Sequence, residues 1–98
     1  MAFTEETIQK AWEKGKEVPS HDSKVYRKDH CDAWIIRGMY GNRKSLYGWE
    51  IDHIKPVSKG GTDDLSNLQP LQWENNANRQ EERLVCVITS KEGINIKK

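Results

Sequence analysis

The segment WEIDHIKPVSKGG, residues 49–61, constrains the fold more than any other part of the sequence. Apolar and acidic side chains alternate over its first four positions, the pattern of a half-buried β-strand: Trp49, Glu50, Ile51 and Asp52. Pro56 cannot donate a hydrogen bond within a sheet, and the glycine pair at 60–61 favours a turn. The strand is therefore expected to end close to His53, with a loop after it.

A short return strand and a helix are predicted downstream of this loop. LQPL, residues 68–71, is at most a short strand, and QWENNANRQEERL, residues 72–84, has helical spacing. One face of this helix is formed by Trp73, Ala77, Gln80 and Leu84. Asn76 falls on the same face, which is expected to pack inward. A buried amide needs either a hydrogen-bonding partner or a bound cation.

The remaining segments predict a small single domain of the α+β class that covers residues 1–98. Thr4 is a suitable N-cap for an amphipathic helix over residues 5–14. VYRKD and AWIIRGMY are short apolar pieces, either strand or irregular. Near the C-terminus, VCVITS predicts a final strand and KEGINIKK is expected to fray.

The composition excludes several classes of protein. Charged residues make up 32% and the mean hydropathy is −0.92, but four Trp and three Tyr supply enough apolar surface for a core. No run of about 18 apolar residues predicts a membrane span, and the first residues lack the apolar region of a secretory signal. A cytoplasmic location is therefore expected. The net charge of +1 does not by itself identify a nucleic-acid-binding protein.

The two cysteines, Cys31 and Cys86, belong to no CxxC pair. In a cytosolic chain, two buried free thiols are the favoured expectation, with a disulfide between them as the alternative. Zinc bound by these cysteines together with His21 and His30 is not expected, because the spacing is scattered.

Asp52 and His53 are the strongest candidates for residues of a catalytic site. One carboxylate and the Asn76 amide, with water or phosphate oxygens, would suit Mg²⁺ or Mn²⁺. Histidine titrates near neutral pH, so His53 is a candidate general base. Neighbours in a regular strand point to opposite faces, so the strand must end or twist at His53 for both to reach one phosphate. The other Asp-His pair, Asp29-His30, has no following loop glycines or helix amide and is not expected to form a site.

The run EIDHIKPVSKGGTDDLSNLQPLQWENNANR resembles the HNH endonuclease family. The resemblance covers residues 47–80 and implies a ββα-metal (His-Me finger) core, with an N-terminal helix and loop in residues 1–24 and a short C-terminal strand. It implies that His53 is the general base and that Asp52 and Asn76 hold one divalent cation. Asn67 would tie the loop and orient the imidazole. Glu50 is either a supporting partner of the metal site or an ordinary strand carboxylate.

Two features depart from the pattern of this family. Many small relatives have two CxxC pairs that bind a structural zinc; here Gln72 and Asn75 stand where the second pair would be, and no structural zinc is expected. Apolar packing is expected to replace it, through Trp12, Trp34, Trp49 and Trp73. Asn76 stands where many relatives have His, which favours hard metal ions.

The resemblance implies a metal-dependent endonuclease that hydrolyses DNA, with the 3′ oxygen as leaving group. Duplex DNA would be contacted mainly through its backbone, by a monomer or weak dimer. The segment 33–49 contains no acidic residue, so it and the predicted helix supply candidate phosphate contacts, with solvated surface as the alternative: Arg43, Arg79 and Arg37. A non-catalytic nucleic-acid-binding module and a structural zinc protein are the other readings.

Overall fold

The computed structural model describes residues 3–81 and 83–98. Their helices and strands, in chain order, are α1 (Glu5–Trp12), β1 (Tyr26–Lys28), β2 (Trp34–Ile36), β3 (Trp49–His53), β4 (Leu68–Gln72), α2 (Trp73–Ala77), β5 (Ile88–Lys91) and β6 (Ile94–Lys97). Short 3-10 turns lie at Arg37–Met39, Val57–Lys59 and Leu65–Asn67. The strands form three antiparallel hairpins, β1–β2, β3–β4 and β5–β6. The predicted α+β class is confirmed.

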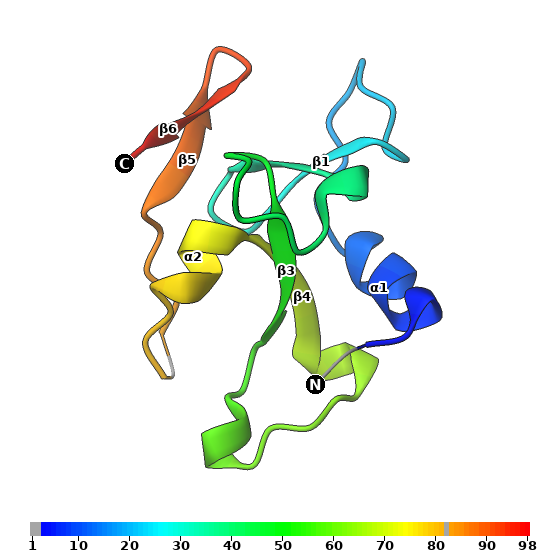
Figure 1. Cartoon of the computed structure of the whole chain (residues 1–98), viewed down its shortest axis with the longest axis vertical. Helices are drawn as coiled ribbons and strands as arrows, with labels where there is room; N and C mark the ends of the chain where they lie inside the picture. Colours follow the sequence, from blue (N-terminus) through cyan, green and yellow to red (C-terminus); the bar gives the residue numbers. More distant parts are fainter. Residues whose placement is uncertain (1–2, 82) are drawn as a thin grey trace.

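The β3–β4 hairpin lies at the centre, with α1 and α2 on opposite sides of it (Figure 1). Trp49 pairs with Gln72 at one end and His53 with Leu68 at the other. β3 ends at His53, as the proline at position 56 predicted. β4 has five residues and is longer than expected. Pro70 is tolerated in this strand because the hairpin has only two strands, so the outer edge of β4 faces no third strand that would need the N–H that proline lacks.

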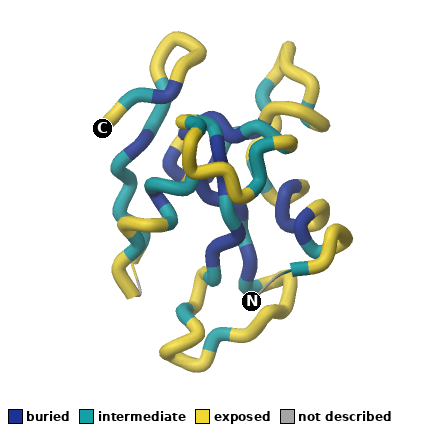
Figure 2. The backbone as a smooth tube through the Cα atoms, viewed as in Figure 1, coloured by how far each residue is buried: buried dark blue, intermediate teal, exposed yellow. Residues whose placement is uncertain are grey.

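The main core lies between α1 and one face of this hairpin. Thr4 caps α1, and its side-chain oxygen accepts a hydrogen bond from the amide of Thr7 at 3.1 Å. The helix ends two residues earlier than expected, at Trp12. The ring of Trp12 packs against that of Trp49 with 5.3 Å between centroids. Figure 2 shows that buried residues concentrate here, while the loop between β3 and β4 is mostly exposed.

A buried carboxylate joins the β1–β2 connection to the start of α2. Asp29 is 1% exposed, and its Oδ1 accepts hydrogen bonds from the amides of Cys31 and Ala33, both at 2.9 Å. Its Oδ2 accepts from the Gln72 amide at 2.9 Å and from Asn75 Nδ2 at 3.1 Å. Burial raises the pKa of the Asp29 carboxyl, and these four donors oppose that rise. Asp29 therefore has a structural role.

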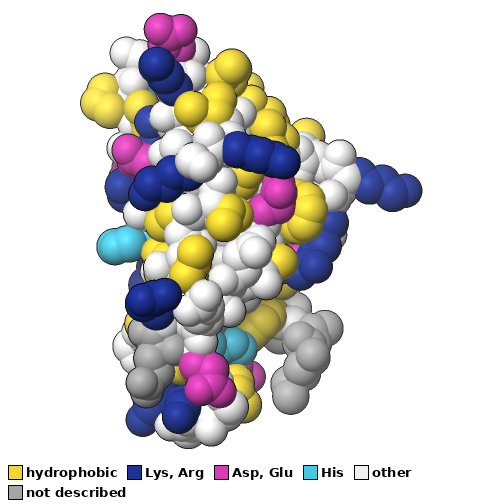
Figure 3. Space-filling view, turned by 90° about the vertical axis from the view of Figure 1, so that its left-hand side faces the viewer, with side chains coloured by type: hydrophobic (Ala, Val, Ile, Leu, Met, Phe, Trp, Pro, Cys, Tyr) yellow, Lys and Arg dark blue, Asp and Glu magenta, His cyan; other side chains and the backbone are white. Residues whose placement is uncertain are grey.

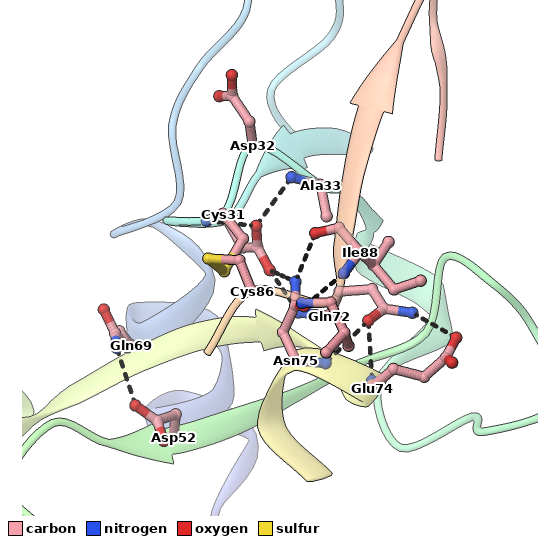
Figure 4. Close-up of a disulfide and its surroundings, with 12 residues drawn as sticks. Cys31, Asp32, Ala33, Asp52, Gln69, Gln72, Glu74, Asn75, Cys86 and Ile88 are labelled. Carbon is pink, nitrogen blue, oxygen red and sulfur yellow. Dashed lines mark hydrogen bonds between the residues drawn. A yellow bond between two sulfur atoms is a disulfide. The ribbon is translucent and has the colours of Figure 1, made fainter. Parts of the chain in front are cut away.

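Cys31 and Cys86 form a disulfide, so the prediction of two free thiols was wrong (Figure 4). The two Cα atoms are 5.5 Å apart although 55 positions separate the residues. The Asn75 side chain brings the segments together, because its Oδ1 accepts hydrogen bonds from the amides of Val87 and Ile88, both at 2.8 Å. No local sequence pattern indicates such a contact. Disulfides persist in oxidising compartments, so the cytoplasmic location stays a prediction.

The predicted helix over residues 72–84 was too long. α2 ends at Ala77, and residue 82 lies outside the described part. Asparagine has a low helix propensity, and three asparagines fall at positions 75, 76 and 78. The buried amide is Asn75, which is fully buried, whereas Asn76 is half-buried. The prediction that Asn76 shares the inward face with Gln80 and Leu84 was therefore wrong.

The C-terminal segment does not fray. Residues 94–97 form β6, and the turn before it has positive φ at Glu92 (52°) and Gly93 (84°), as a tight hairpin turn requires. The buried side chain of Asn95 anchors the hairpin: its Oδ1 accepts from the Trp34 amide at 2.6 Å, and its Nδ2 donates to the Trp34 carbonyl at 2.8 Å. Neither helix found in residues 3–81 and 83–98 has the length and apolar character needed to cross a bilayer.

Candidate active site

Asp52 lies on the face of β3 that α2 covers. Alternation along the strand sends Trp49 and Ile51 to the core and Asp52 to the opposite face, where it is 3% exposed. Its Oδ1 accepts a hydrogen bond from Arg79 Nε at 3.1 Å, and its Oδ2 accepts one from Gln69 Nε2 at 2.8 Å (Figure 4). The carboxylate is thereby fixed in orientation.

Glu50 lies on the same face and organises a second group of polar side chains. Arg43 donates two hydrogen bonds to its carboxylate, at 2.6 and 2.8 Å, and Asn76 Nδ2 donates a third at 2.9 Å. The Arg43 hydrogen bond is the main reason that the pKa of Glu50 lies below its usual range; burial opposes this and the Asn76 bond adds to it.

This contact also defines the orientation of the Asn76 amide. An ionised carboxylate only accepts hydrogen bonds, so the amide nitrogen of Asn76 must face Glu50. Its Oδ1 accepts no hydrogen bond from any residue that the structure describes. Asn76 therefore has an oxygen available as a ligand.

His53 is the last residue of β3, and its side chain is 23% exposed. Its Nε2 lies 2.7 Å from Asp63 Oδ1, and its ring centroid is 6.0 Å from that of Phe3. Asp63 was not predicted from the sequence as a partner of His53. The available signal was weak, namely two consecutive aspartates after the glycine pair of the loop.

One open cavity brings these groups together. It has a volume of 320 Å³, and its lining includes Asp52, His53, Asn76 and Arg79. The predicted acid, imidazole and amide thus reach one space from the end of β3 and from α2. The strand ends at His53, which allows both Asp52 and His53 to line this cavity despite their opposite directions within a regular strand.

Asn67 closes the loop between β3 and β4. Its Oδ1 accepts from the Lys55 amide at 2.7 Å, and its Nδ2 donates to the carbonyls of Lys55 and Thr62 at 3.1 and 2.8 Å. Its own carbonyl accepts from the Ile54 amide at 2.8 Å. These bonds fix the backbone directly after His53, and no hydrogen bond joins Asn67 to the imidazole itself.

The three arginines predicted to contact phosphate all have partners within the chain. Arg79 Nη2 donates to the carbonyls of His53 and Ile54 at 3.3 and 2.7 Å, while its Nη1 donates to no described residue. Arg43 pairs with Glu50, as given above. Arg37 donates to Gln9 on α1 at 2.9 Å, outside the lining of the cavity. Figure 3 shows one face of the molecule, on which basic side chains are spread among hydrophobic and acidic ones.

The oxygen donors present suit a hard divalent cation that uses few protein ligands. Within residues 3–81 and 83–98, no group of three or more His, Cys, Asp or Glu side chains is placed to hold a metal. A pair made of the Asp52 carboxylate and Asn76 Oδ1 is a smaller ligand set, with both residues on one cavity. Arg79 already bonds to Asp52, so a cation would share that carboxylate with the guanidinium.

A comparison with protein families supports a nuclease. The family model described as HNH endonuclease matches residues 39–79, which include β3, the loop, β4 and α2. The match over this segment confirms the resemblance to the HNH endonuclease family found in the sequence. HNH nucleases act on DNA and generally use a divalent metal, so the match indicates a nuclease or nucleic-acid-related function. No curated protein and no solved structure matches the chain.

Proposed function

We propose that this protein is a metal-dependent endonuclease that hydrolyses phosphodiester bonds of DNA. The observation that carries the proposal is the single cavity lined by Asp52, His53 and Asn76. An acid, an imidazole and an amide oxygen together supply a cation site and a general base beside it.

In the proposed reaction, His53 takes a proton from a water molecule as the water oxygen attacks phosphorus. A new oxygen–phosphorus bond forms and the bond from phosphorus to the 3′ oxygen breaks. The leaving oxygen takes a proton from solvent, which gives 5′-phosphate and 3′-hydroxyl ends. Asn67 holds the backbone after His53 and so helps to keep the imidazole in place.

Asp52 and Asn76 Oδ1 would hold Mg²⁺ or Mn²⁺, and the cation would supply stabilisation of negative charge on the phosphate and the leaving oxygen. Glu50 supports this site rather than forming it. Its carboxylate binds the Asn76 amide nitrogen and thereby leaves the amide oxygen available. Between the two roles expected for Glu50, the contact favours that of a supporting partner.

Arg79 is the best placed of the arginines to contact a substrate phosphate. It lines the cavity, and its Nη1 group is available while Nε holds Asp52. Arg43 is 54% exposed beside Glu50 and is a second candidate. Arg37 bonds to α1, which favours a structural role for it.

We further propose that residues 1–98 act as one nuclease domain, with residues 47–80 as the ββα-metal core. A single site cuts one strand in each encounter, so a monomer or weak dimer would nick duplex DNA. Cleavage of both strands would need two copies or two encounters.

One observation favours a second candidate, a nucleic-acid-binding module without hydrolysis. Both oxygens of Asp52 already accept hydrogen bonds, one of them from a cationic side chain. In that reading, Arg79 replaces the metal and the domain only binds DNA.

Nicking of supercoiled plasmid separates the two candidates. The wild-type protein with Mg²⁺ or Mn²⁺ is expected to convert supercoiled DNA to open circles, and EDTA or His53→Ala is expected to abolish this. DNA binding without nicking would support the module. Nicking that persists in both controls would indicate a contaminating nuclease and would contradict the proposal.

A further inference from the structure

We propose that Asp63 positions His53 and selects the ring nitrogen that acts as base. Its carboxylate oxygen lies 2.7 Å from His53 Nε2. The inference about the reaction rests on the proposed function, whereas the inference about the imidazole rests only on this contact. Asp63 acts through His53 and is a positioning residue.

The chemistry of the contact determines where the imidazole proton lies. An ionised carboxylate has no proton to donate, so Nε2 must donate to Asp63. In the neutral ring, Nδ1 then has the lone pair. Nδ1 is therefore the nitrogen that accepts the proton of the attacking water. After this transfer, the positively charged ring still donates to Asp63, whose negative charge stabilises it.

The loop holds Asp63 in place from both sides. Before it, the Gly61 amide donates to the Pro56 carbonyl at 2.9 Å, and Asn67 Nδ2 donates to the Thr62 carbonyl at 2.8 Å. After it, the Asp64 amide lies 3.3 Å from Thr62 Oγ1. The Asp63 side chain is 55% exposed, so water competes for its hydrogen bond. A fixed backbone lowers the entropy lost when the pair forms.

His53 lines two cavities, and the groups expected to hold the metal lie on only one of them. One, of 450 Å³, is also lined by Asp63 and Thr62; the other, of 320 Å³, is lined by Asp52 and Asn76. Asp63 belongs only to the first. This arrangement allows a carboxylate to orient the ring from one side while the reaction takes place on the other.

Nuclear magnetic resonance of ¹⁵N-labelled protein tests the selection of the nitrogen directly. At alkaline pH, two-bond ¹H–¹⁵N correlations report which ring nitrogen is protonated, and His53→Ala identifies the signals of His53 among the three histidines. The wild type is expected to show only the Nε2–H form. Asp63→Ala is expected to show detectable Nδ1–H form as well, because the carboxylate that holds the proton on Nε2 is then absent. Asp64→Ala, a change at the neighbouring residue without contact to the ring, is expected to match the wild type.

Nicking kinetics test the consequence for the reaction. Asp63→Ala is expected to lower kcat by about 10- to 100-fold, with KM for plasmid within about twofold of the wild type, and Asp63→Glu to restore part of kcat. Asp64→Ala is expected to retain kcat. Circular dichroism confirms that each variant is folded.

Two results would overturn the inference. The first is an imidazole in Asp63→Ala with the same protonation pattern as the wild type. The second is a changed pattern with unchanged kcat, since selection of the nitrogen would then not serve the reaction. If the wild type does not nick DNA at all, the proposed function fails, but the spectra still decide whether Asp63 selects the nitrogen of His53.

Discussion

Asp29 and Asp52 each precede a histidine, and each is almost fully buried, yet their surroundings give them different roles. Four donors surround Asp29 and join separate segments through it. Asp52 instead lies at the edge of a cavity that it shares with His53 and Asn76. The neighbouring residues in the sequence distinguished the two pairs, because only the second is followed by a glycine loop and a helix amide.

Exchange of Asp29 for the isosteric amide tests its structural role. Asp29→Asn places an amide nitrogen against two N–H donors, which then lose their acceptor. The free energy of unfolding is expected to fall by at least about 2 kcal/mol. Asp32→Asn is the matched control and is expected to cost no more than about 1 kcal/mol, because its ion pair with Lys16 is exposed. Urea unfolding measures both. Equal losses in the two variants would disprove the role given to Asp29.

Glu50 gives a prediction about pH. Its folded-state pKa lies below the ordinary value of 4.5, so it stabilises the fold above that pH and loses the contribution as the pH falls through the folded-state pKa. The difference in unfolding free energy between wild type and Glu50→Gln is expected to be larger at pH 7 than at about pH 3. Urea titrations at both pH values test this, and a difference independent of pH would contradict it.

For individual residues, the residue types and their spacing in the sequence predicted the candidate site, namely Asp52, His53, Asn67 and Asn76. The partners of these residues were not predictable. Asp63 is ten positions from His53 and meets it only because the loop folds back. Arg43 meets Glu50 in a similar way. Such contacts depend on the path of a loop, and loops, unlike helices and strands, have no repeating pattern of residues from which that path could be predicted.

At the level of structural elements, the conformation of the loop between β3 and β4 depends on one glycine, Gly61. A Cβ atom at Gly61 would lie 1.8 Å from the Lys55 carbonyl oxygen, closer than any side chain allows. The chain passes itself here, and the close approach places Asp63 and Asn67 near the end of β3. The turn was predictable from the glycine pair, but the close approach was not.

Gly61→Ala is therefore expected to distort the loop. We expect nicking to fall by at least about 10-fold and the free energy of unfolding by about 1–3 kcal/mol. Gly38→Ala is the control, because a Cβ atom there has no neighbour within 4 Å and a change of less than about 0.5 kcal/mol is expected. Plasmid nicking and urea unfolding are the measurements. Full activity in Gly61→Ala would show that the close approach is not needed.

α2 shows where periodicity is misleading. Residues of one face recur at helical spacing up to Leu84, but the helix ends at Ala77, next to asparagines of low helix propensity. Arg79 turns toward β3 and bonds to Asp52 and to two carbonyls beyond it. The short helix therefore positions both Asn76 and Arg79 on the cavity.

In the whole molecule, polar and covalent links hold together three hairpins that are each too small to be stable alone. Asn95 ties the C-terminal hairpin to β2, and the disulfide ties it to the turn after Asp29. These links could not be predicted from the sequence, because each joins positions 55 or more apart. The α+β class was predictable, because strand and helix periods are local.

Removal of the disulfide is expected to destabilise the fold. Cys31→Ser combined with Cys86→Ser is expected to lower the free energy of unfolding by about 2–4 kcal/mol, because the bond closes a long loop in the unfolded chain. Urea unfolding with and without a thiol reductant measures this. The reductant is expected to destabilise the wild type and to leave the double variant unchanged. A wild type insensitive to the reductant would contradict a stabilising disulfide.

A crystal structure with Mn²⁺ and a short DNA duplex is the most direct test of the candidate site, because anomalous scattering locates manganese without assumptions about its ligands. We expect one manganese bound by the Asp52 carboxylate and Asn76 Oδ1, with a DNA phosphate between the metal and His53. The account would be contradicted if the cavity held no manganese, Arg79 still bonded to the Asp52 carboxylate and the DNA bound elsewhere.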